Sequence, residues 1–208
     1  MTTLGASPTR MPSPGDRAAI GFFMASGVGI VVWAITAAVI RISAALSDSS
    51  ISVLAEFAGT PAQAPIGPNG ALVEVELDRA VLSTTELPTA SLVSLVISDV
   101  LAATTITLVV ACLLALSTAV LRGAIFSRRN TILVSTAGIA VLIGAASTLF
   151  FANMAANGAF AAISNGEFDN VVIAVDLLPY AIGAFVVALI TTAFSVGERL
   201  QRETDGLV

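Results

Sequence analysis

Four long apolar stretches separate the polar segments of this sequence. They cover residues 18–41, 92–121, 131–152 and 177–196. A helix needs about 20 mostly apolar residues to cross a bilayer core of about 30 Å, and each stretch meets that length. The first is too long for the apolar core of a cleaved signal peptide, so we interpret it as an anchor. The pattern predicts an all-α membrane protein, a four-transmembrane-helix bundle.

Arginine positions predict how this bundle is oriented. Most of the nine basic residues lie before the first stretch, between the second and third, or after the fourth, namely Arg10, Arg17, Arg122, Arg128, Arg129, Arg199 and Arg202. The alternate connecting segments, residues 42–91 and 153–176, contain only Arg79. Because Lys and Arg are retained on the cytoplasmic side of a membrane, we expect both termini to be cytoplasmic.

The same division predicts the organisation of the whole chain. Residues 18–196 form one transmembrane domain, with residues 42–91 and 153–176 as extracytoplasmic loops. Residues 1–17 are rich in Thr, Ser, Pro and Gly and are typical of a disordered cytoplasmic tail. Residues 197–208 form a cytoplasmic C-terminal tail, whose alternating charges favour a helix that continues the fourth span.

The first outer loop contains a strand-like pattern. A Pro/Gly-rich turn region at 61–70 precedes Val73 to Asp78, where apolar and acidic residues alternate. A period of two indicates a half-buried strand. The β-branched segment Val171 to Val175 in the second outer loop is a candidate partner. Together they predict a small β-containing extracytoplasmic loop cap, with a negative field from the acidic residues around it.

Composition excludes several functions. Apolar residues make up 56 % of the chain and charged residues 11 %, and the mean hydropathy is +0.96. The net charge of −5 argues against direct nucleic-acid binding, which needs a basic surface. The sequence has no histidine and no lysine, which removes Ser-His, Cys-His and Schiff-base chemistry and histidine-ligated metals. We therefore expect a protein that is not an enzyme and holds no cofactor or metal.

Three ionisable residues at the ends of the apolar stretches form a candidate polar cluster. They are Arg41, Asp99 and Asp176. The aspartates lack the Gly-x-Gly-Asp setting of intramembrane aspartyl proteases. One interpretation pairs Arg41 with an aspartate beside a proton or ligand path. The interpretation we favour places both aspartates near helix N-termini, where the helix dipole stabilises a negative charge, and Pro179 fits an early helical turn.

Small residues on the spans predict close helix packing. Gly21, Ala25 and Gly29 share a face of the first span, and the third span has a similar face. Small residues let helices approach in a bilayer. We favour packing within the bundle, with a homo-oligomer as the alternative.

Two segments predicted to be cytoplasmic carry a family resemblance. One contains Gly123, Phe126 and Asn130, and the other contains Phe194, Gly197, Leu200 and Glu203. Together they resemble the bacterial four-span membrane proteins grouped as domain-of-unknown-function family 2975. The resemblance implies a protein of the bacterial inner membrane and a helix-turn-helix regulator as partner. The candidate partner-docking residues are Gly123, Phe126, Arg128, Arg129, Asn130, Gly197, Leu200 and Glu203.

These patterns lead to one functional hypothesis and one rival. The first is a non-enzymatic membrane partner or sensor in the lipid bilayer that acts with a cytoplasmic regulatory protein. The rival is a small oligomeric transporter, or an immunity or resistance factor, with Asp99 or Asp176 in a substrate path. An internal repeat or a broken helix would favour transport, and the sequence has neither.

Overall fold

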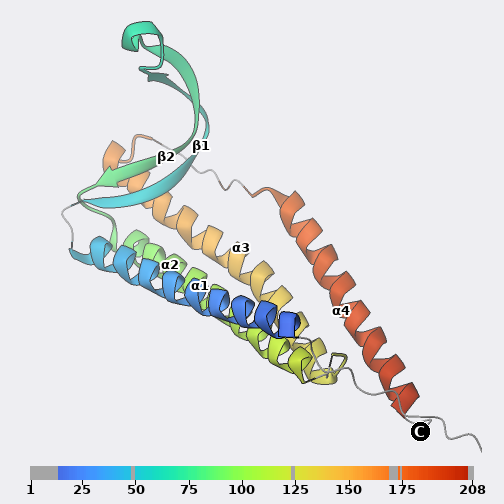
Figure 1. Ribbon diagram of the computed structural model, residues 1–208. Coiled ribbons are helices and arrows are strands. Elements are labelled where there is room, and N and C mark those ends of the chain that lie inside the picture. The colour runs from blue at the N-terminus through green and yellow to red at the C-terminus, as the bar shows by residue number, and fades with distance from the viewer. Residues whose placement is uncertain (1–13, 48–49, 123–124, 169–172, 174, 206–208) are drawn as a thin grey trace, which may run out of the picture. The chain divides into compact units, whose positions relative to one another are not determined.

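The computed structural model describes residues 14–47, 50–122, 125–168, 173 and 175–205 (Figure 1). In chain order its elements are α1 (Pro14–Ser47), β1 (Ile51–Ala64), the short 3-10 helix η1 (Pro68–Gly70), β2 (Val73–Thr84), α2 (Thr89–Leu121), α3 (Arg128–Ser164) and α4 (Leu177–Asp205). The chain is mostly helical, as the sequence predicts.

Four of these helices are long and apolar enough to cross a membrane, which confirms the four predicted spans. Only a small share of each window of highest hydropathy is buried, and large side chains such as Trp33 and Phe185 project from these helices. In water such surfaces would be unstable, but lipid tails are as apolar as these side chains. The fold therefore defines a multi-pass membrane protein.

The helices are longer than the apolar stretches predict. α3 continues from Ala152 to Ser164, so half of the expected second outer loop is helical. Pro14 to Arg17, expected in the disordered tail, are the first residues of α1, while residues 1–13 of that tail lie outside the described residues. α4 continues through Glu198 to Asp205, which confirms the predicted helical extension.

The chain divides into two compact units. Unit 1 comprises Met1–Ala34, Thr105–Leu142 and Leu178–Val208, and unit 2 comprises Ile35–Thr104 and Ile143–Leu177. In unit 1, glycines let the helices approach closely. A Cβ added at Gly27 of α1 would lie 3.2 Å from side-chain atoms of Val110 and Leu114 on α2. A Cβ added at Gly138 of α3 would lie only 2.5 Å from a side-chain atom of Val187 on α4, so this approach is closer still.

The small-residue face predicted on the first span is not the one that packs. Among the described residues, no atom lies within 4 Å of a Cβ built at Gly21 or Gly29. Gly27, which lies on a different face of α1, contacts α2. The expectation that Gly21 and Gly29 pack within the bundle is therefore wrong. The predicted face was chosen from the spacing of Gly21, Ala25 and Gly29, and that spacing does not include Gly27.

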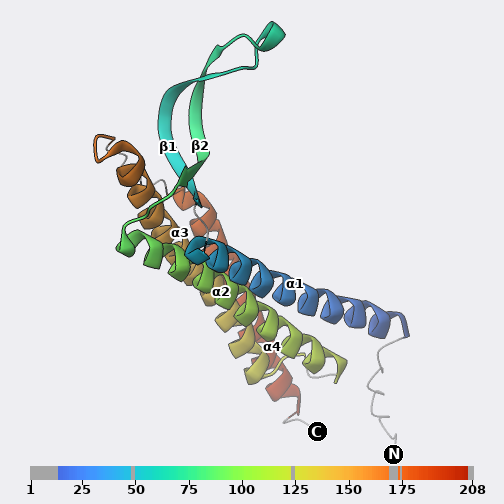
Figure 2. The ribbon, with the colours of Figure 1, turned by 90° about the vertical axis from the view of Figure 1, so that its left-hand side faces the viewer.

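Unit 2 contains an antiparallel hairpin of β1 and β2, which stands out from the helical segments of its unit in both views (Figures 1 and 2). Ile51 lies opposite Thr84 and Ala64 opposite Val73, with an irregularity between Glu56 and Thr60. At the turn, Asn69 and Gly70 have φ angles of 57° and 76°, a conformation that suits these two residue types.

The predicted strand at Val73 to Asp78 is confirmed, because it lies in β2, where Val75 and Leu77 are half-buried and Val73, at the start of the strand, is exposed. The prediction that Val171 to Val175 is its partner strand is wrong. β2 pairs with β1, and Ile173 and Val175, the described residues of the segment expected to pair, lie in no strand. The rest of that segment, Val171, Val172 and Ala174, lies outside the described residues.

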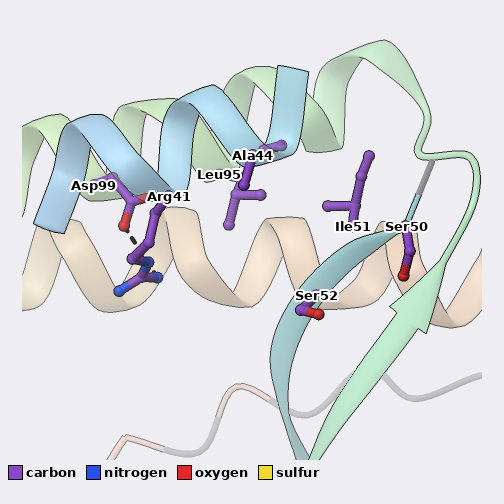
Figure 3. Close-up of a pocket in the computed structure, with 8 residues that line it drawn as sticks. Arg41, Ala44, Ser50, Ile51, Ser52, Leu95 and Asp99 are labelled. Carbon is purple, nitrogen blue, oxygen red and sulfur yellow. Dashed lines mark ion pairs between the residues drawn. The ribbon is translucent and has the colours of Figure 1, made fainter. Parts of the chain in front are cut away.

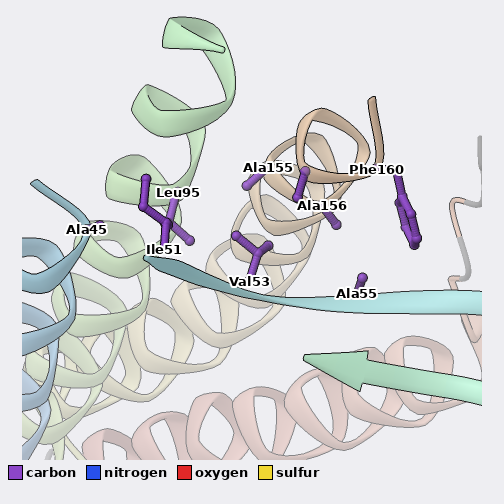
Figure 4. Close-up of a cluster of buried hydrophobic side chains, with 9 residues drawn as sticks. Ala45, Ile51, Val53, Ala55, Leu95, Ala155, Ala156 and Phe160 are labelled. Carbon is purple, nitrogen blue, oxygen red and sulfur yellow. The ribbon is translucent and has the colours of Figure 1, made fainter. Parts of the chain in front are cut away.

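The core of unit 2 lies where β1 crosses α3 (Figure 4). Ile51, Val53 and Ala55 alternate along β1, so their side chains share one face. That face packs on Ala155, Ala156, Ala159 and Phe160 of α3. The alanines leave room for the strand, and the rings of Phe57 and Phe160 meet edge to face at 5.0 Å. This packing fixes the base of the hairpin over the ends of α1 and α2.

Candidate functional site

An ion pair lies beneath β1 in unit 2. Arg41 is in the last two turns of α1, and its Nη2 lies 3.0 Å from Oδ1 of Asp99 on α2. The Asp99 side chain is 6 % exposed, whereas that of Arg41 is 66 % exposed. Figure 3 shows the arginine reaching from its helix to the carboxylate. The buried anion therefore holds one end of a guanidinium whose other atoms remain accessible.

The face of α2 that carries Asp99 is unusually polar for a buried surface. Ser94 and Ser98 are 2 % and 4 % exposed. Each hydroxyl donates to a carbonyl of its own helix, at 2.7 Å to Ala90 and at 2.8 Å to Leu95. The serines thus satisfy their own hydrogen bonds, which leaves the Asp99 carboxylate as the charged group of this face.

The helix-capping interpretation is wrong for Asp99. α2 begins at Thr89, so Asp99 is the tenth residue after its first, and the dipole acts only over the first turn. Asp176 immediately precedes Leu177, the first residue of α4, and Pro179 lies in the first turn, as expected. Capping stays an open interpretation for Asp176, which is exposed and lines neither of the cavities described below.

Two cavities of unit 2 meet at Arg41. The first, of about 160 Å³, contains the ion pair and is otherwise lined by Ala44, Ala45, Ser50, Ile51, Ser52 and Leu95 (Figure 3). The second, of about 150 Å³, lies along β1 and α3 and is lined by Arg41, Val53, Leu54, Glu56, Leu95, Ser98, Leu149, Ala152, Asn153 and Ala156. The first adds two serines, Ser50 and Ser52, to the ion pair, and the second has mainly apolar walls.

The one carboxylate that lines the second cavity is itself paired. Oε1 of Glu56 lies 2.7 Å from Nη2 of Arg79, its neighbour across the hairpin. The Glu56 side chain is 25 % exposed, so this pair is only partly screened by water. Arg79 therefore offsets the negative charge that Glu56 would otherwise place beside Arg41.

Sequence reasoning found the two charged residues of this site but missed its walls. Ser50, Ser52 and Asn153 lie in segments interpreted as loops. A signal for β1 was available, because Ile51, Val53, Ala55 and Phe57 recur with the period of two that identified β2. Asn153 gave no comparable signal, since it lies within a helix whose continuation was not predicted.

The second candidate site, the predicted docking segments, lies in unit 1. The ring of Phe126 packs on the ring of Phe194 at 5.7 Å and covers Gly197, where an added side chain would collide with it. Oγ1 of Thr131 lies 3.1 Å from Oε2 of Glu198, and Glu198 also pairs with Arg202. The α2–α3 connection and the end of α4 are thus joined into one clasp.

The clasp changes the roles expected for the docking residues. Phe126 and Gly197 pack on each other, and Asn130 is fully buried, with Nδ2 donating to the Ile125 carbonyl at 2.9 Å. These three hold the clasp together. Exposed residues on its outside are Arg128, Arg129, Leu200 and Glu203. Gly123 lies outside the described residues.

Among the described residues, no group of three or more His, Cys, Asp or Glu side chains is arranged to hold a metal ion. The fold and the two sites define the class of the protein as a multi-pass α-helical membrane protein with a strand hairpin. Comparison with protein-family models, curated proteins and solved structures finds no match to this chain. The resemblance to family 2975 therefore stays a prediction.

Proposed function

We propose that the protein is a non-enzymatic membrane partner protein that holds a cytoplasmic regulator at the bacterial inner membrane. The arginine distribution supports an orientation with both termini in the cytoplasm. Unit 2 and its hairpin then face the cell envelope and form the sensing side. The resemblance to family 2975 supports a small helix-turn-helix protein as the regulator.

The clasp is the observation that carries this proposal. Two segments far apart in sequence are joined through Phe126, Gly197 and Glu198. Their packing orders a short loop and a helix end that would otherwise have few contacts. The ordered surface presents a cation, Arg129, and an exposed apolar side chain, Leu200, which suits a protein partner that brings its own DNA-binding surface.

In-cell photocrosslinking tests the proposal. A photoreactive residue is placed at Arg129 or Leu200, and crosslinked proteins are identified by mass spectrometry. The matched control is the same residue at Phe185, which is 70 % exposed in the apolar part of α4. We expect both clasp probes, and not the control, to capture one small DNA-binding protein. Crosslinks only to lipid or to the protein itself would overturn the proposal.

A second candidate function, a small oligomeric transporter or an immunity or resistance factor, is favoured by the Arg41 and Asp99 pair. Charges inside membrane segments often mark substrate or proton paths. This candidate predicts that Asp99→Asn abolishes the biological phenotype while the clasp and its crosslinks are unaffected. The regulator proposal predicts that Arg129→Glu abolishes both the phenotype and the crosslink from Leu200.

A further inference from the structure

Arg41 has more hydrogen-bonding capacity than its ion pair uses. A guanidinium carries several N–H donors in a fixed planar fork, and it binds oxyanions with two of them at once. Within the described part of the chain, the contact of Arg41 is the one from Nη2 to Asp99. The side chain is 66 % exposed and lines both cavities. Asp99 thus positions a cation whose remaining donors are available to a ligand.

The two cavities differ in the chemistry they offer beside this cation. The first adds the hydroxyl-bearing residues Ser50 and Ser52, which can donate to an anion. The second adds apolar walls, chiefly Leu54 and Leu149. A charged head at Arg41 and an apolar tail in the second cavity are therefore accommodated next to each other.

From this arrangement we propose that Arg41 binds the oxyanion head of a small amphipathic molecule, whose short aliphatic tail lies in the cavity along β1 and α3. Ser50 and Ser52 line the cavity beside the head, and Leu54 and Leu149 line the cavity that takes the tail. A volume of about 150 Å³ suits a short chain. Glu56 does not repel the ligand strongly, because Arg79 pairs with it.

The inference goes beyond the tethering of a regulator and does not need it, because binding is measured on the purified protein. Two sources share the proposed chemistry, a free carboxylate from the aqueous phase and an anionic lipid from the bilayer. Both present an oxyanion attached to an aliphatic chain, so the experiment distinguishes them by competition.

Fluorine NMR provides the binding assay. The full-length protein is placed in nanodiscs of zwitterionic lipid and titrated with a six-carbon carboxylate that ends in a trifluoromethyl group, with empty nanodiscs as background. We expect saturable broadening of the fluorine signal. The alcohol with the same tail should bind at least about tenfold more weakly, because it cannot form charge-assisted hydrogen bonds with Arg41. Equal binding of acid and alcohol would overturn the proposal.

Variants locate the site. Arg41→Gln should weaken binding of the carboxylate at least about tenfold, while Arg17→Gln, which removes the same charge from an exposed position in the other unit, should leave binding unchanged. Ala152→Leu fills the tail cavity and keeps the ion pair, so it should also abolish binding in a folded protein. Binding that survives both Arg41→Gln and Ala152→Leu would exclude this site.

Nanodiscs in which about a fifth of the lipid is anionic distinguish the two sources of the ligand, a soluble carboxylate and an anionic lipid. Loss of carboxylate binding there shows that lipid occupies the site, and unchanged binding assigns it to a soluble carboxylate. Either result supports oxyanion binding by Arg41 only if the Arg41→Gln protein binds the carboxylate equally in the two lipid mixtures. A lipid effect that persists in that variant would contradict the role of Arg41.

Discussion

Removal of either partner of the Arg41 and Asp99 pair should destabilise the protein to very different extents. The Asp99 side chain is 6 % exposed and that of Arg41 is 66 % exposed. Arg41→Met leaves a carboxylate buried without its counter-ion. Asp99→Asn leaves a guanidinium that is already largely in contact with solvent. The cost of an unpaired charge follows its burial, so the arginine substitution is the more damaging one.

The exposed fractions of the two side chains also determine the expected free-energy cost of each substitution. Breaking a fully buried ion pair costs about 3–5 kcal/mol, and Arg41 is only partly buried, so we expect Arg41→Met to cost about 2–3 kcal/mol. Asp99→Asn should cost about 1 kcal/mol or less, as for exposed pairs. The double variant should resemble Asp99→Asn alone, because the buried charge is then absent. The coupling between the two substitutions therefore equals the cost of Arg41→Met, about 2–3 kcal/mol.

Unfolding in mixed micelles with increasing dodecyl sulfate, followed by circular dichroism, measures these free energies. The matched control is Arg79→Gln at the other ion pair of unit 2, where Glu56 is 25 % exposed and the cost should stay within about 1 kcal/mol. The reasoning fails if Asp99→Asn is as destabilising as Arg41→Met, or if Arg41→Met costs no more than the control.

Three further predictions concern other parts of the chain. In a background without the native cysteine, a cysteine at Ala71 should react with a membrane-impermeant maleimide in intact cells and one at Thr204 should not; the reverse pattern would contradict the proposed orientation. Gly197→Val should cost about 1–3 kcal/mol in dodecyl sulfate unfolding, because its side chain would collide with Phe126; Phe126→Ala should relieve most of that cost in the double variant. Phe160→Ala should cost about 3–5 kcal/mol and increase proteolysis of the hairpin, and an unchanged cleavage pattern would show that the hairpin base does not depend on this ring.

The helices could be predicted because the bilayer imposes a length and a polarity that a single sequence displays directly. Their ends could not be predicted as well. The segment from Asn153 to Ser164 contains Asn157 and Gly158 and resembles a loop, but Gly158 lies against Ser91 of α2, where a larger residue would not fit. Close packing with α2 favours a helix in that segment, and such packing cannot be predicted from the local sequence.

The hairpin and the ion-pair site could also be predicted only in part, because both depend on long-range contacts. Period-two alternation identified β2, but its partner β1 is chosen by the turn at Asn69 and Gly70 and by packing on α3, not by composition. An ion pair of Arg41 with one of two aspartates was the less favoured of two interpretations, and the structure shows that pair with Asp99. The cavities depend on β1 crossing α3, a long-range contact that no local pattern contains.

The two edges of the hairpin differ in how they resist aggregation. β1 is interrupted at Gly59, where φ is +64°, and it contains Pro61, which lacks a backbone N–H, so a foreign strand cannot pair along it without interruption. β2 contains neither a glycine nor a proline. It instead places Glu74, Glu76 and Asp78 at alternate positions, on one exposed face. Two hairpins that met along β2 would bring these carboxylates together, so charge repulsion keeps neighbouring molecules in a crowded membrane from joining into a continuous sheet.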